Sequence, residues 1–147
     1  MKMNKMNLVA AALTLAFAGP AFAADAMSKD QVKAERDRIS ADSKSNKDKC
    51  KSLKANAKDI CMAEARGQEK VAKAELDAKQ KDSPKARYDV AAAKADMEYS
   101  VAKEKCDDMK GEQKKACEKD AKAARDTAKN QAKAERDAAD GKKAAAK

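Results

Sequence analysis

Two segments decide the fold of this chain: Cys50-Lys-Ser-Leu-Lys-Ala-Asn-Ala-Lys-Asp-Ile-Cys61 and Cys106-Asp-Asp-Met-Lys-Gly-Glu-Gln-Lys-Lys-Ala-Cys117. Both follow the pattern Cys-x-x-(Leu or Met)-Lys-x-x-x-Lys-x-x-Cys, and Ser83-Pro84 lies midway between them. Such a repetition indicates a duplicated structural unit. Because large apolar side chains are few in the rest of the chain, we expect the four cysteines to supply its main cross-links.

The first 23 residues have the features of a secretory signal peptide. Lys2 and Lys5 precede an apolar run over residues 8–18, and Ala21-Phe22-Ala23 forms a small-x-small cleavage site. We place the cut after Ala23. The apolar run is short for a membrane span and no later segment approaches that length, so we expect no transmembrane segment after cleavage.

The composition predicts long helices with little core. The chain has no His and no Trp, and both of its phenylalanines, Phe17 and Phe22, lie in the signal segment. Much of the remaining apolar content is alanine, whose burial removes too little apolar area to offset the entropy of ordering. The bias toward Ala, Lys and Glu is typical of long helices and coiled coils. We therefore predict an all-α fold, an elongated helical hairpin of coiled-coil-like helices with two disulfides and little globular core.

Capping signals divide the chain. Ser28-x-x-Gln31 is a capping box that opens a helix, and helix formers then dominate up to Gln80. Ser83 as N-cap and Pro84 as first helical residue start a second helix. The expected units are the signal peptide (1–23), a first helical repeat with Cys50 and Cys61 (24–82), a second with Cys106 and Cys117 (83–140), and a basic flexible tail (141–147).

Two apolar stripes follow these helices. The first recurs every seven residues, and the second advances in alternating steps of four and three, as in a coiled-coil seam. The first stripe consists of Val32, Ile39, Asn46, Leu53 and Ile60, and the second of Tyr88, Ala92, Ala95, Tyr99, Ala102, Cys106 and Met109.

The cysteines of an exported chain are expected to form two disulfides. We predict no metal site, because the spacing is not Cys-x2-4-Cys and the chain has no His. In an unbroken helix, cysteines eleven residues apart lie about 16.5 Å apart, whereas a disulfide needs Cα atoms within about 7 Å. Continuous helices would therefore pair Cys50 with Cys117 and Cys61 with Cys106.

A helix break between the cysteines would instead allow the local pairs Cys50–Cys61 and Cys106–Cys117. Gly111 is suited to end a helix, and Asn56 with Asp59 resembles an N-cap and an acidic first turn. The residues alone leave both pairings open.

The two segments resemble the C-x-x-L-x-G-N-A-K-D-V-C-x-x-E-A repeat of small lysine- and alanine-rich periplasmic proteins of proteobacteria, often described as TolA-like cell-envelope proteins. Lys85-Ala-Arg-Tyr-Asp89 and Val101-Ala-Lys-Glu-Lys-Cys-Asp107 extend the similarity. Ala55 replaces the family glycine in the first copy, and Glu112-Gln113 replaces Asn-Ala in the second. Because the family motif contains a helix break, the resemblance implies the local disulfides and a periplasmic location, and no particular activity.

An enzyme is the least expected class. Without His or a Gly-rich phosphate loop, and with too little core to desolvate a pocket, the chain offers no catalytic residues and no cofactor site. We expect a helical spacer or interaction protein of the cell envelope, similar to the helical middle domain of TolA. TolA also has a membrane helix and a globular domain that this chain does not show, so its role is not carried over. The expected partners are envelope proteins or a second copy bound through the helical seam.

Two other functions fit the sequence. The formal charge is +9, or +7 without Lys2 and Lys5. Such a charge attracts lipopolysaccharide, anionic lipid or nucleic acid, so weak polyanion binding is expected. The lysines alternate with acids, however, and do not line one face. A stress-related holdase is the third possibility.

Overall fold

The computed structural model describes residues 27–145, which form four α-helices. These are α1 (Lys29–Cys50), α2 (Ala55–Gln80), α3 (Pro84–Cys106) and α4 (Gly111–Ala145). The all-α prediction is confirmed, since the described part of the chain contains no strand. The expected signal peptide, residues 1–23, lies outside the described residues.

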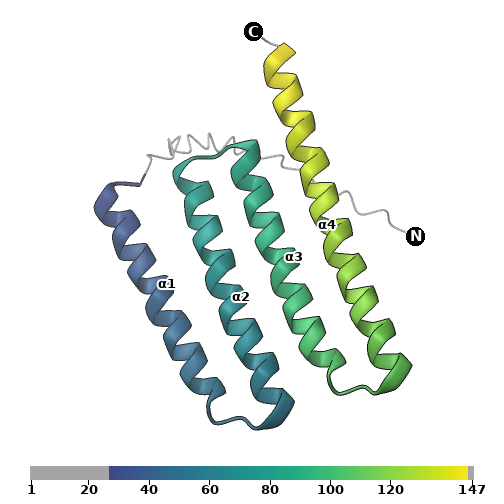
Figure 1. Cartoon of the computed structure of the whole chain (residues 1–147). Helices are drawn as coiled ribbons and strands as arrows, with labels where there is room; N and C mark the ends of the chain where they lie inside the picture. The colour runs from purple at the N-terminus through teal and green to yellow at the C-terminus, as the bar shows by residue number, and fades with distance from the viewer. Residues whose placement is uncertain (1–26, 146–147) are drawn as a thin grey trace, which may run out of the picture.

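The helices stand side by side in a single layer (Figure 1). Each helix runs antiparallel to the next and packs only against its neighbours in sequence, so within residues 27–145 α1 makes no contact with α4. The layer therefore has two open faces and two open edges. Four helices in a row cannot enclose an interior as a bundle does.

The sequence signals for the helix starts at one end of the layer are confirmed. The Ser28 hydroxyl accepts a hydrogen bond from the Gln31 amide at 3.2 Å, and the Gln31 side chain accepts one from the Ser28 amide at 2.8 Å. The Ser83 hydroxyl likewise accepts from the Ala86 amide at 3.0 Å, with Pro84 beginning α3. These caps satisfy amides that the first turn of a helix leaves free.

The helices break inside both cysteine segments, at residues 51–54 and 107–110. Ala55 and Gly111 begin the next helices with φ of 48° and 57°, in the left-handed region. The seven-residue stripe predicted for the first half is wrong, because Leu53 lies in the loop and is exposed. The chain folds as two short hairpins joined by a turn at residues 81–83.

Among the described residues, buried positions are few, and six of the nine form pairs eleven residues apart. Ile39 and Cys50, Ala65 and Leu76, and Ala95 and Cys106 are buried pairs at this spacing. Eleven residues make three turns of 3.67 residues, which keeps a stripe on one side of a nearly straight helix.

Small residues let the helices approach closely. At Gly67 of α2, an added Cβ would overlap Cβ and Cγ of Met97 in α3, so any larger residue would force the two helices or the Met97 side chain to shift. Close approach through small residues compensates in part for the shortage of large apolar side chains.

Helix α4 is the longest and its C-terminal end projects beyond the other helices (Figure 1). It continues through Gly141 to Ala145, so the boundary at residue 141 predicted for the basic tail does not end the helix. Every described residue from 141 onward is exposed. None of the described helices has both the length and the apolar character needed to cross a bilayer.

Candidate functional site

All four cysteines are paired locally, Cys50 with Cys61 and Cys106 with Cys117. The Cα atoms are 5.5 Å and 5.7 Å apart, within the range that a disulfide bridges. This is the pairing that the resemblance implies, and the crossed pairs do not form. Each bridge joins the last residue of one helix to the second turn of the next, and so fixes the loop between them.

The two disulfide loops lie at the same end of the layer, opposite the α2–α3 turn (Figure 1). They have the same conformation: the Leu53 amide donates to the Cys50 carbonyl at 3.1 Å, and the Met109 amide donates to the Cys106 carbonyl at 3.0 Å. Leu53 and Met109 are 41% and 43% exposed. The duplicated segments therefore present equivalent apolar side chains to solvent.

The predicted N-cap role of Asn56 is wrong. The residue before α2 is Lys54, whose side chain makes no capping hydrogen bond. The Asn56 amide group instead donates to the Glu104 carbonyl of α3 at 2.7 Å. The Glu104 carbonyl also accepts from the Asp107 amide at 3.1 Å, so the Asn56 hydrogen bond is a second one, and it connects the start of α2 to the second hairpin.

A polar cluster around Glu69 joins α1 to α2. The Glu69 carboxylate accepts hydrogen bonds from Lys47 at 2.7 Å, from Lys73 at 2.6 Å and from the Ser43 hydroxyl at 2.5 Å. These bonds lower the pKa of Glu69 from 4.5 to about 2, with Lys47 as the largest cause. Glu69 therefore remains ionised at any pH near neutrality.

A groove of about 490 Å³ opens beside this cluster, between α1 and α2. Ile39, Ala65 and Leu76 line it together with charged residues of both signs. Among these, Glu35 and Arg38 already form an ion pair with each other. The groove is thus a polar cleft of mixed charge between two helices.

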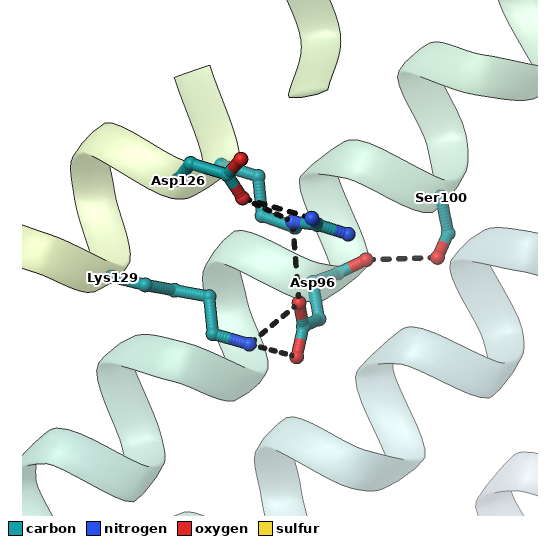
Figure 2. Close-up of polar contacts among 5 residues, drawn as sticks. Asp96, Ser100, Asp126 and Lys129 are labelled. Atoms are coloured by element: carbon teal, nitrogen blue, oxygen red, sulfur yellow. Dashed lines mark hydrogen bonds and ion pairs between the residues drawn. The ribbon is translucent and has the colours of Figure 1, made fainter. Parts of the chain in front are cut away.

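A second polar cluster joins α3 to α4 (Figure 2). The Asp96 carboxylate accepts from Lys129 Nζ at 3.1 and 3.0 Å, and Arg125 Nε lies 4.0 Å away. Arg125 also pairs with Asp126 at 2.8 Å, and the Ser100 hydroxyl donates to the Asp96 carbonyl at 2.8 Å. The arrangement fixes the register of the second hairpin.

Two arginines of α4 stack on the tyrosines of α3. The Arg125 guanidinium carbon lies 4.4 Å from the centre of the Tyr99 ring, and that of Arg136 lies 5.0 Å from the centre of the Tyr88 ring. Sequence reasoning missed these pairs, the Asp96 cluster and the contacts of Glu69 with α1, and only the pair of Glu69 with Lys73 follows from helical spacing. A signal was present for the stacks, because the two tyrosines and the two arginines are each eleven residues apart. Each stack adds a cation–π contact to an otherwise alanine-rich interface.

In the part of the chain that the structure describes, no group of three or more Cys, Asp or Glu side chains is placed to hold a metal ion. Comparison of the chain with protein-family models, curated proteins and solved structures gives no match. The grounds for a function are therefore the geometry of the helical layer, its two loops and its charges.

Proposed function

We propose that this chain is a non-enzymatic interaction protein of the cell envelope, which works as a flat helical platform in the periplasm. The observation that carries the proposal is the single layer of helices, whose two broad faces are open to partners (Figure 1). The signal-like sequence of residues 1–23 supports export, and the two disulfides are compatible with an oxidising compartment.

The helix breaks favour an interaction role over that of a spacer. A continuous helix over residues 29–80 would be about 78 Å long at 1.5 Å per residue. The helices that form have 22 to 26 residues in α1 to α3 and 35 in α4, or about 33 to 52 Å. The folded chain is therefore shorter than a continuous helix would be, and it presents a broader surface to a partner.

The charged clusters support a structural use of the ionisable side chains. Glu69 pairs with Lys47 and Lys73, and Asp96 pairs with Lys129. The low pKa of Glu69 is far from the value that a general acid or base needs near neutral pH. Their role is to set the register between helices.

Thiol trapping in intact cells tests the proposed location. We expect the four cysteines to be protected from alkylation unless a reductant is added, and the protein to fractionate with the periplasm. Free thiols in freshly trapped protein from the cytoplasmic fraction would contradict the proposal.

Photo-crosslinking in intact cells tests the interaction. A photoreactive residue at the exposed positions Lys70 of α2 and Lys94 of α3 should give discrete products with an envelope component. The matched control is Ala144, which is exposed at the projecting end of α4 and away from the faces of the layer. Products that are absent at both face positions, or equal at all three, would count against a platform.

A further inference from the structure

Exposed large apolar side chains are confined to one end of the described structure. Leu53 and Met109 are the exposed large hydrophobic residues of 27–145, and each is the third residue of a disulfide loop. The turn between α2 and α3, at the opposite end, is Lys81-Asp82-Ser83 and contains no apolar residue. The position of the two residues therefore follows the duplication and is not a random surface feature.

Lysines without ion-pair partners surround the same two loops. Each of six exposed lysines lies in a disulfide loop, in the last turn before it or in the first turn after it, and none forms a salt bridge with a described carboxylate. They are Lys49, Lys54, Lys58, Lys103, Lys105 and Lys110. Three other lysines in these loops and turns do form salt bridges, and they are Lys47, Lys51 and Lys114. These six charges remain free to meet an external anion.

The spacing of the two loops is fixed before any partner binds. Each loop is closed by its own disulfide, and the Asn56 side chain of the first hairpin donates to the Glu104 carbonyl beside the second loop at 2.7 Å. A preorganised pair of anchors loses little further entropy on binding. This makes simultaneous use of both loops favourable.

We propose that this end of the layer docks onto the surface of an anionic phospholipid bilayer. We call it the loop end: residues 51–54 and 107–110 with the six free lysines. Leu53 and Met109 insert at the boundary between headgroups and acyl chains, and the lysines lie at the level of the lipid phosphates. Two short apolar anchors need such a basic surround, because one small apolar group holds a protein at a membrane only weakly.

Docking through the loop end would leave the faces of the layer free. Both loops lie at one end of antiparallel helices, so the helices would extend away from the membrane (Figure 1). The inference rests on the proposed function, since it supplies the surface on which an envelope platform would stand.

The first loop should dominate the electrostatic part of binding. Residues 47–59 contain five lysines and two aspartates, whereas residues 103–115 contain five lysines and four acidic residues. In the second loop, Asp107 is neutralised by Lys114 at 2.8 Å, but Asp108 has no such partner among the described residues. We therefore expect Lys54→Gln to weaken binding more than Lys110→Gln.

Co-sedimentation with lipid vesicles tests the proposal. The sample is the oxidised protein recovered after export, with its mass measured, because the apolar run at residues 8–18 would itself bind lipid if it were retained. We expect binding to vesicles of phosphatidylglycerol and phosphatidylcholine, weakening with salt, and none to phosphatidylcholine alone. A mass that includes residues 1–23 would count against the proposed mature form independently of the lipid result.

Matched variants locate the binding surface. Lys54→Gln with Lys110→Gln should weaken binding about 25-fold, which is an average of about fivefold per lysine with the larger share from Lys54. Lys29→Gln with Lys81→Gln removes the same charge at the opposite end and should change it little. Equal losses in the two double variants would show a general polycation effect and overturn the docking surface.

A fluorescence probe tests insertion directly, because the chain contains no tryptophan. Leu53→Trp should show a blue-shifted emission on anionic vesicles, whereas Lys81→Trp should not. Leu53→Ser with Met109→Ser should lower the affinity by at least about tenfold, as expected for lost apolar burial. An unshifted Leu53→Trp spectrum in vesicle-bound protein, or a serine double variant that binds as well as the parent, would overturn the proposal.

Discussion

Replacing Ala55 with glycine should stabilise the protein, although the change lowers helix propensity. Ala55 begins α2 with φ of 48°, in the left-handed region. This conformation costs an L-residue with a side chain about 1–2 kcal/mol. Glycine avoids that cost, but its greater conformational entropy stabilises the unfolded chain by about 0.5–1 kcal/mol. The expected net effect of Ala55→Gly is a stabilisation of about 0.5–1 kcal/mol.

The second repeat provides the reverse experiment. Gly111 has φ of 57°, and apart from the adjoining residues and the backbone of its own helix no heavy atom lies within 4 Å of the position that its Cβ would take. Gly111→Ala therefore adds backbone strain without a clash and should destabilise the protein by about 0.5–1 kcal/mol. Gly141→Ala is the matched control, because Gly141 lies inside α4 with open space around it and without the left-handed φ. The same change there should stabilise by up to about 1 kcal/mol.

Urea unfolding of the disulfide-intact protein, followed by helical circular dichroism, measures all three variants. The midpoint should rise for Ala55→Gly and Gly141→Ala and fall for Gly111→Ala, with the slope unchanged. A lower midpoint for Ala55→Gly would refute the reasoning. So would shifts of the same sign for the two glycine-to-alanine variants, because only the backbone conformation separates those sites.

Three further predictions concern the contacts between helices. Glu69→Gln should destabilise the folded protein by about 1–2 kcal/mol at neutral pH. The pKa of Glu69 is about 2 in the folded protein and 4.5 without its partners, so the parent protein should lose this stabilisation as the pH falls from 4.5 toward 2. The stability of the variant should not change in this way over that range. Gly67→Ala should cost about 1–3 kcal/mol in thermal unfolding, because its Cβ would overlap Met97. Met97→Ala should restore only part of that loss, because the Cβ that remains at position 97 would still lie 2.7 Å from the added methyl group. Replacing Cys50 and Cys61 together with serine should cost a little under about 3 kcal/mol, and a melting temperature unchanged from the parent would contradict a stapling role.

Local signals predicted the helices and their starts at Ser28 and Ser83 correctly, because capping depends on residues within one turn. The break in the first repeat was harder to predict. Ala55 is a strong helix former, so nothing in its propensity marks a left-handed residue, whereas Gly111 in the second copy suits that conformation. The residues alone therefore left the disulfide pairing open, and the resemblance was needed to favour one.

The candidate site was predicted only in part. The cysteines stood out by their number and spacing, but Leu53 and Met109 fitted the apolar stripes and were assigned to a seam, while the structure exposes both. The pair of Glu69 with Lys73, four residues later, could be predicted from helical spacing and is formed, whereas Lys47 beside Glu69 and Lys129 beside Asp96 come from neighbouring helices and were not predicted. Asp96 has no Lys or Arg three or four residues away in the sequence, so only the register between α3 and α4 brings Lys129 to it.

Each described helix packs only against the helices next to it in sequence, so the stability of this molecule depends on a linear series of interfaces. Helices α2 and α3 are each flanked on two sides, whereas α1 and α4 are flanked on one. In such an array, free energy is a sum over units and the interfaces between successive units, as in repeat proteins. Amide protection should therefore be highest in the central pair and fall toward both edges. A hairpin added or deleted at an edge would leave the remaining interfaces as they are, so the layer can change in width over evolution without redesign of its middle.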